Sequence, residues 1–70
     1  MEKDLEVTVN GKPYPYTKGM TLSLLLDALL ETPDSVVAEV NGKIISRDAF
    51  ATTALVAGDR IEIVHFVGGG

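Results

Sequence analysis

The 70-residue sequence contains no cysteine. It therefore has no disulfide, and no thiolate is available for catalysis or metal binding. The single histidine, His65, and the scattered carboxylates form no cluster with metal-ligand spacing. No base, nucleophile and oxyanion donor stand in a pattern typical of an active site, so we expect a protein that is not an enzyme and binds no cofactor of its own.

Basic residues and long apolar runs are also scarce. Six Lys and Arg against ten Asp and Glu give a net charge of −4. This balance argues against nucleic acid as a partner, because phosphate binding needs concentrated positive charge. No apolar stretch approaches the roughly 20 residues of a membrane-spanning helix. Residues 1–4 lack the basic start and apolar core of a signal peptide. We expect no membrane contact, a cytoplasmic location and a monomeric free chain.

The 46% hydrophobic content is ample for one small packed domain. Residues 5–9 alternate apolar and polar, which predicts a strand with one buried face. Asn10-Gly11 is a strong hairpin signal, because both residues tolerate positive φ. Residues 12–16 then form a second strand, which Pro13 and Pro15 confine to a short or edge position.

A helix follows, for which Thr21 is a plausible N-cap. One apolar stripe recurs at helical spacing and is interpreted as core, whereas Leu24 falls outside it and is partly exposed. Pro33 ends the helix at or before Thr32. The stripe consists of Leu22, Leu25, Leu26, Leu29 and Leu30.

The second half contains three more strands. Residues 36–40 and 43–45 flank a second hairpin turn, Asn41-Gly42, and residues 60–66 form the last strand after a turn at Gly58-Asp59. Between them, Ser46 caps a short helical turn and residues 51–57 are irregular. One helix across a mixed four- or five-stranded sheet, with the first and last strands adjacent at its centre, is an α+β architecture of the β-grasp (ubiquitin-like) type. We assign residues 1–66 to this domain.

Alternation in the last strand predicts which side chains are buried. Ile61 and Ile63 point inward, whereas Val64 and Phe66 point outward. Such strand-end side chains are either ordinary sheet packing or a docking patch at the root of the C-terminal segment. His65 falls in the inward register, where a lone histidine is usually a structural residue with a satisfied hydrogen bond.

Residues 67–70 are expected to be a flexible tail. Gly68, Gly69 and Gly70 have no side chain to pack and maximal backbone freedom. Such a segment is a thin thread ending in a carboxylate, able to enter a channel too narrow for any side chain. Glycine-rich ends are also ordinary frayed termini, so the tail alone does not decide between the two interpretations.

Over essentially its whole length the chain resembles the ThiS-like sulfur-carrier family of thiamine biosynthesis, bacterial relatives of ubiquitin. The region from Gly58 onward is the most specific part. The residues that carry the resemblance are Val9-Asn10-Gly11-Lys12, Thr21-Leu22, Leu25-Leu26, Val37-Ala38-Glu39-Val40-Asn41-Gly42, Leu55, Gly58-Asp59-Arg60-Ile61-Glu62-Ile63 and Val64-His65-Phe66-Val67-Gly68-Gly69.

The resemblance implies a carrier on which an E1-like adenylyltransferase joins the terminal carboxylate to AMP, using ATP and Mg²⁺. Sulfur from a donor such as a cysteine desulfurase then replaces AMP, and the resulting thiocarboxylate delivers sulfur to thiazole synthase. The family ends in two glycines and this chain in three, which places the thiocarboxylate on Gly70, or on Gly69 if the third glycine is not native. Gly68 belongs to the stem. Val64, Phe66 and Val67 are the candidate partner-docking residues.

Other functions remain open at this stage. The chain also fits the sulfur carrier of molybdopterin synthase or of another sulfur-transfer pathway, which would share the adenylation step but use another acceptor enzyme. A ubiquitin-like protein modifier would form isopeptide bonds with target lysines. An inert β-grasp interaction module would keep its function after deletion of Gly69 and Gly70.

Overall fold

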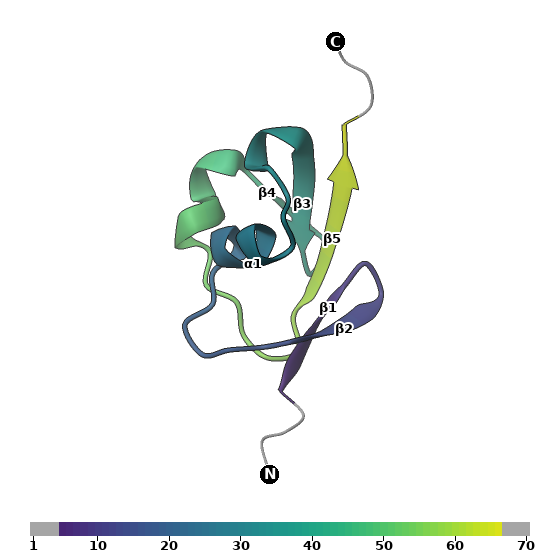
Figure 1. The fold of residues 1–70 in the computed structure, drawn as a ribbon, viewed down its shortest axis with the longest axis vertical. Coiled ribbons are helices and arrows are strands. Elements are labelled where there is room, and N and C mark those ends of the chain that lie inside the picture. Colours follow the sequence, from purple (N-terminus) through teal and green to yellow (C-terminus); the bar gives the residue numbers. More distant parts are fainter. Residues whose placement is uncertain (1–4, 67–70) are drawn as a thin grey trace.

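A single main helix lies across one face of a five-stranded mixed sheet (Figure 1). The computed structural model describes residues 5–66, so the predicted flexible tail, residues 67–70, lies outside the described residues. The strands lie in the order β2-β1-β5-β3-β4. The elements are β1 (Glu6–Val9), β2 (Lys12–Pro15), α1 (Leu22–Ala28), the 3₁₀ helix η2 (Pro33–Ser35), β3 (Val36–Val40), β4 (Lys43–Ile45), the 3₁₀ helix η3 (Arg47–Thr52) and β5 (Arg60–His65). The predicted α+β architecture is confirmed.

The last strand, β5, is the centre of the sheet. It pairs in parallel with β1, where Thr8 lies opposite Arg60 and Val9 opposite Ile61. On its other side it pairs antiparallel with β3, over a longer register that reaches His65. The first and last strands are therefore neighbours, as predicted. The residues that precede the C-terminal segment belong to the central strand, which is paired on both sides.

Both hairpins turn at the predicted Asn-Gly pairs. Asn10 and Gly11 have φ of 51° and 84°, and Asn41 and Gly42 have φ of 53° and 85°. Positive φ at both central residues is the type I′ geometry, whose twist matches that of the two flanking strands. Asparagine and glycine are the residues that adopt it at least cost, so the two turns have the same physical origin.

The strand with two prolines, β2, lies at an edge of the sheet as predicted. Pro13 and Pro15 donate no backbone hydrogen bond, which an interior strand would need on both sides. The strand itself ends at Pro15, one residue earlier than predicted, but the pairing continues because the Tyr16 N–H donates to the Leu5 carbonyl at 3.1 Å.

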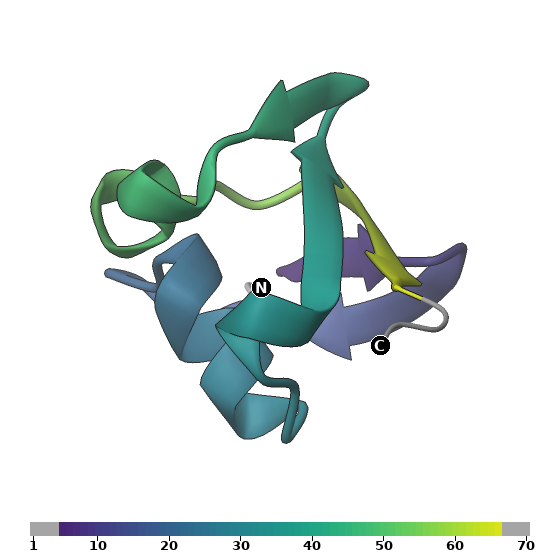
Figure 2. The same cartoon turned by 90° about the horizontal axis from the view of Figure 1, so that it is seen from above.

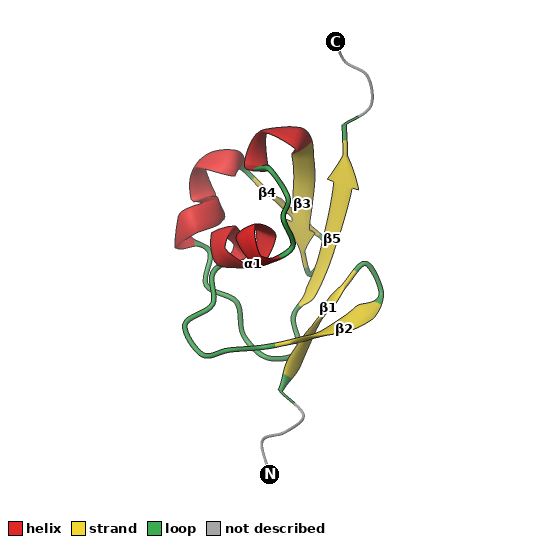
Figure 3. Ribbon diagram, viewed as in Figure 1, coloured by secondary structure: helices red, strands yellow, loops and turns green. Residues whose placement is uncertain are grey.

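The core fills the space between the sheet and the helices, which all lie on one side of the sheet (Figures 2 and 3). The inward-facing residues of β1, β3 and β5 meet the buried face of α1 there. The core consists of Val7, Leu22, Leu25, Leu26, Val36, Ala38, Phe50, Leu55, Ile61 and Ile63. The opposite face of the sheet has no helix over it in the described part of the chain, and this face carries the candidate site.

The helix begins as the sequence predicts, and its end at Ala28 agrees with the predicted end at or before Thr32. The Thr21 hydroxyl accepts a hydrogen bond from the Leu24 N–H at 3.2 Å, which is an N-cap. Leu25 and Leu26 are fully buried and Leu29 packs against the core. Leu24 is exposed, in agreement with its place outside the stripe.

The assignment of Leu30 to the core was wrong: its side chain is 91% exposed. The helix closes with a Schellman motif, in which the Glu31 N–H donates to the Leu26 carbonyl at 2.9 Å and the Leu30 N–H to the Asp27 carbonyl at 3.0 Å. This motif puts Leu30 in the left-handed region at φ 62°. The helical spacing therefore ends before Leu30, and its side chain turns away from the core.

The segment before β5 is also more regular than predicted. The helical turn after Ser46 extends as η3 to Thr52, and Phe50 inserts into the core from it. Ser46 occupies the N-cap position of η3, but its side chain makes no capping hydrogen bond. The Thr53 hydroxyl instead closes the turn by donating to the Ala49 carbonyl at 2.6 Å.

Candidate docking surface at the end of the last strand

The predicted alternation along β5 is confirmed. Ile61 and Ile63 face the core and are 0% and 7% exposed, whereas Val64 and Phe66 point away from it and are each 61% exposed. Exposed valine and phenylalanine side chains next to each other on one face of a strand have no role in the core. Two of the three predicted docking residues thus lie together on the uncovered face of the sheet.

The backbone beneath these two side chains is held in place. Val64 lies directly opposite Val37 of β3. Phe66 follows the end of β5, yet its N–H donates to the Ser35 carbonyl at 3.0 Å. The pairing with the β3 side therefore continues through the last described residue, and the apolar pair sits on an ordered backbone.

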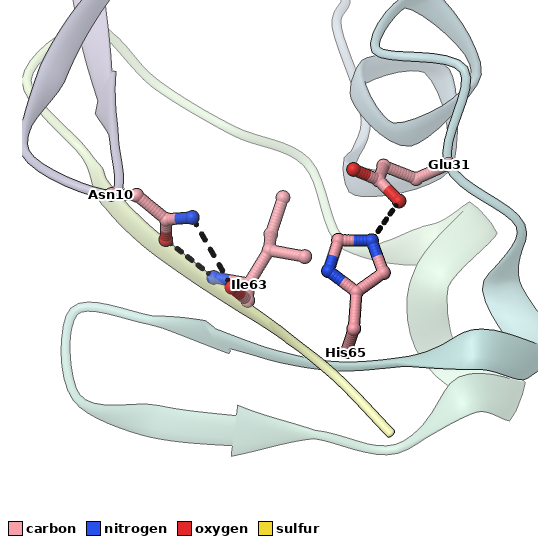
Figure 4. Close-up of polar contacts among 4 residues, drawn as sticks. All are labelled: Asn10, Glu31, Ile63 and His65. Carbon is pink, nitrogen blue, oxygen red and sulfur yellow. Dashed lines mark hydrogen bonds and ion pairs between the residues drawn. The ribbon is translucent and has the colours of Figure 1, made fainter. Parts of the chain in front are cut away.

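On its other side, β5 is supported by an asparagine side chain (Figure 4). The pairing with β1 ends at Val9 opposite Ile61. Beyond it, the Asn10 Nδ2 donates to the Ile63 carbonyl at 3.2 Å, and the Ile63 N–H donates to the Asn10 Oδ1 at 2.7 Å. The side-chain amide of Asn10 thus makes the two hydrogen bonds to β5 that a peptide group would make if β1 continued. The sequence marks Asn10 only as a turn residue, so this second role was missed.

The second turn asparagine fixes the start of β5. The Arg60 N–H donates to the Asn41 Oδ1 and the Asn41 Nδ2 donates to the Asp59 Oδ1, both at 2.9 Å. The Asp59 Oδ2 also accepts the Val56 N–H at 2.8 Å, and Asp59 is the buried charged residue of the described chain. The two Asn-Gly turns therefore hold β5 from both sides, one at its start and one near its end.

His65 also contributes to the end of the strand. Its Nε2 lies 2.6 Å from the Glu31 Oε1, which links the tip of β5 to the segment after α1 (Figure 4). The predicted structural role with a satisfied hydrogen bond agrees with this contact. The imidazole is 60% exposed, so it lies at the rim of the core rather than in it.

The remaining predicted site residues, Val67, Gly68, Gly69 and Gly70, lie outside the described residues, and their roles stay predictions. Within residues 5–66, no helix is long and apolar enough to cross a membrane.

With this geometry established, the comparison with known proteins is decisive. The sequence pattern of the ThiS family matches residues 7–70. The chain belongs to the ThiS family. That match covers both Asn-Gly turns, the whole of β5 and the glycine segment, which are among the features that carry the resemblance.

A relative of similar length agrees. The sulfur carrier protein ThiS of Bacillus subtilis is 41% identical over 64 residues, covering 89% of this chain and 96% of that protein. The crystal structure of the thiamine biosynthesis protein ThiS from Geobacter metallireducens superposes with a TM-score of 0.75 at 37% identity, covering 94% of this chain and 100% of that one. The β-grasp fold is thereby confirmed, and the family is that of the thiamine sulfur carriers.

A longer relative shares the same segment. The thiazole synthase of Magnetococcus marinus is 38% identical over 66 residues, which are 94% of this chain but 20% of that protein. A second thiazole synthase, from Paramagnetospirillum magneticum, matches over the same share of its length. The chain thus spans about a fifth of these two relatives, which carry a domain of this kind together with other sequence.

Proposed function

We propose that this domain carries sulfur as a thiocarboxylate on Gly70 and delivers it for formation of the thiazole of thiamine. The observation that carries the proposal is the family match, which runs without a break from Val7 through Gly70. The composition supports it, because a chain without cysteine has no side-chain thiol and leaves the terminal carboxylate as the attachment point for sulfur.

A carboxylate needs activation before it accepts sulfur. At neutral pH it is ionised, with a reference pKa of about 3.5, and is a poor acyl donor. In the proposed first step, an E1-like adenylyltransferase uses ATP and Mg²⁺, and the Gly70 carboxylate attacks the α-phosphate and releases pyrophosphate. A donor such as a cysteine desulfurase holds the sulfur as a persulfide, and a thiol reductant, itself oxidised to a disulfide, releases that sulfur at the sulfide level. This sulfur then attacks the acyl carbon, and AMP leaves with the electron pair of the broken C–O bond, which gives the thiocarboxylate.

Glycine suits both steps. The attacking sulfur meets no Cβ at the acyl carbon, and Gly68 and Gly69 leave the approach to it free of side chains. The chain itself supplies no catalytic group in this scheme; the partner enzymes do, and we expect them to work in the cytoplasm, where ATP and cysteine are available.

The folded domain itself contributes the surface that the partner enzymes recognise. Val64 and Phe66 stand exposed on an ordered backbone immediately before the terminal segment. Burying such side chains fully is worth about 1.5–3 kcal/mol each, so two of them add substantially to a specific complex. We propose that these two residues and Val67 dock the carrier on thiazole synthase and on the adenylyltransferase. The two thiazole synthases that contain a similar segment support the first of these partners.

Intact mass spectrometry tests the proposal. The chain is incubated with ATP, Mg²⁺, the adenylyltransferase and a sulfur source, and we expect the mass gain of one sulfur-for-oxygen exchange. The matched control lacks Gly69 and Gly70 and should keep its mass. A full-length chain that stays unmodified, while the same enzyme modifies another carrier, would contradict the proposal; covalent conjugates with other proteins would favour a ubiquitin-like modifier.

A further inference from the structure

Two glutamates of like charge face each other in the middle of the sheet. Glu39 of β3 and Glu62 of β5 are directly opposite in the antiparallel register. Directly opposed residues have Cβ atoms about 4.5–5.5 Å apart, and like charges in this arrangement destabilise a sheet. Both side chains are half-buried, so water screens their repulsion less than it would on a fully exposed surface.

The described part of the chain does not neutralise this pair. Its salt bridges join Arg47 to Asp34 and His65 to Glu31, and neither involves the two glutamates. Arg60 lies two residues before Glu62 on the same face of β5, yet no ion pair within residues 5–66 joins it to either carboxylate. Within residues 5–66, the two opposed carboxylates therefore have no cation as an ion-pair partner.

Apolar side chains flank the two carboxylates toward the end of β5 and toward β4. Because side chains alternate along each strand, the next outward residues are Val37 on β3 and Val64 on β5, which are paired. On the outer side, Ile44 of β4 lies opposite Glu39 and is 66% exposed. The helices all lie on the other side of the sheet (Figures 1 and 2), so no helix of residues 5–66 covers this face. We call it the open face: Glu39 and Glu62, with Val37, Ile44, Val64 and Phe66 beside them.

We infer that the open face binds thiazole synthase through an arginine or lysine of that enzyme, which inserts between Glu39 and Glu62 while apolar side chains cover Val64, Phe66 and Ile44. This inference rests on the proposed function and adds the chemistry of the partner surface. One cation shared by two carboxylates removes their repulsion and forms charge-assisted hydrogen bonds with both. The flanking apolar side chains exclude water from this contact, which strengthens it.

Thiazole synthase is the partner to which we assign this face for two reasons. Two relatives of that name contain a segment similar to this chain in the same polypeptide, which favours direct contact between such a domain and the enzyme. The open face is also continuous with the side chains that lead into the terminal segment, since Val64 and Phe66 belong to both. A partner that covers it thereby receives the segment that starts at Val67.

The inference predicts opposite effects on binding and on folding. In Glu39→Gln and in Glu62→Gln, the repulsion is removed, so the isolated domain should melt at the same or a higher temperature. The dissociation constant for thiazole synthase, measured by calorimetry, should rise about tenfold in each variant, as expected when one partner of a buried charge pair is lost. The binding of both variants should also depend less on salt. Asp27→Asn makes the same charge change on α1, in the other layer, and should bind as the unchanged chain does.

A charge-reversal variant distinguishes a lost binding contact from a loss of folding. Glu39→Lys turns the repulsive pair into an attractive one, so this variant should melt at a higher temperature and yet lose binding by more than either glutamine variant. Unchanged binding in all three variants would overturn the inference, as would glutamine variants that melt at a markedly lower temperature. Loss of binding only to the adenylyltransferase would also overturn it, since the face would then serve the other enzyme.

The same variants separate this inference from the proposed function. Thiocarboxylate formation, followed by mass at saturating adenylyltransferase and sulfur source, should proceed in all of them. If the unchanged chain gains no sulfur, the proposed function fails whatever the open face binds. If sulfur is gained and the glutamine variants bind thiazole synthase normally, the inference about the open face fails alone.

Discussion

The amide of Asn10 should contribute measurably to the stability of the whole domain, although this residue lies in an exposed turn. Asn10→Gly removes the two hydrogen bonds to Ile63, at 2.7 and 3.2 Å, and leaves the backbone free to keep its φ of 51°. Glycine adopts positive φ without strain, so the turn itself should persist. The variant therefore reports the loss of the side-chain support to β5.

The expected size follows from the bonds lost. A typical intramolecular hydrogen bond contributes about 0.5–1.5 kcal/mol net, so two give about 1–3 kcal/mol. For a 70-residue domain, the free energy of unfolding is about 4–10 kcal/mol. The loss is a large part of this, and each kcal/mol should lower the melting temperature by about 4–8 °C. Besides this global loss of stability, hydrogen exchange should become faster at one specific amide, because the Ile63 N–H loses its acceptor.

Leu30→Gly is the matched control, because Leu30 has the same left-handed backbone but an exposed side chain. Relief of the left-handed strain, about 1–2 kcal/mol, should exceed the glycine's extra entropy in the unfolded chain, about 0.5–1 kcal/mol. Urea unfolding should therefore show Leu30→Gly more stable and Asn10→Gly less stable than the unchanged chain. Amide exchange should accelerate at Ile63 in Asn10→Gly alone. A shift of the same sign in both variants, or unchanged exchange at Ile63, would refute this account of the turn.

Three further predictions address the core, the start of β5 and the docking residues. Leu26→Ala should lower the free energy of unfolding by about 2–5 kcal/mol in urea titrations, whereas Leu24→Ala, on the exposed side of α1, should change it by less than about 0.5 kcal/mol; comparable losses would contradict the assigned helix register. Asp59→Ala should lower it by about 2–4 kcal/mol, because two donors lose a buried carboxylate, and an unchanged urea midpoint would show that these bonds contribute nothing. Phe66→Ser should leave the melting temperature within a few degrees and weaken binding to thiazole synthase about tenfold; full binding affinity would remove Phe66 from the docking surface.

Local chemistry made much of the fold predictable. The two Asn-Gly pairs specify type I′ turns, and the prolines of β2 exclude an interior strand. Alternation from Ile61 to Phe66 identifies the buried and exposed faces of β5. Each of these rules depends on residues close together in the sequence, which is why a single sequence was sufficient for them.

The predictions that failed or were missed depend on contacts between distant segments. Leu30 continues the leucine spacing, and only the closure of the helix by Glu31 shows that the stripe has ended before it. The bond from Asn10 to Ile63 joins residues 53 positions apart. It requires the parallel pairing of β1 and β5 to stop at Val9, which no local pattern specifies.

One part of the candidate site could likewise be predicted from the sequence, and the other could not. The exposure of Val64 and Phe66 follows from alternation and was predicted. The opposition of Glu39 and Glu62 depends on the register between β3 and β5, which becomes known only when the two strands are paired. Each glutamate alone is an ordinary surface residue, and their juxtaposition is what gives the open face its specific chemistry.

We propose that sulfur reaches the thiazole through the carboxylate of Gly70. The most direct test supplies a heavy isotope of sulfur to the reconstituted system and follows it by fragment mass spectrometry. The label should appear first on the C-terminal fragment of the carrier and then, in equal amount, in the thiazole product. Label in the product without label on that fragment, or label elsewhere on the chain, would contradict it.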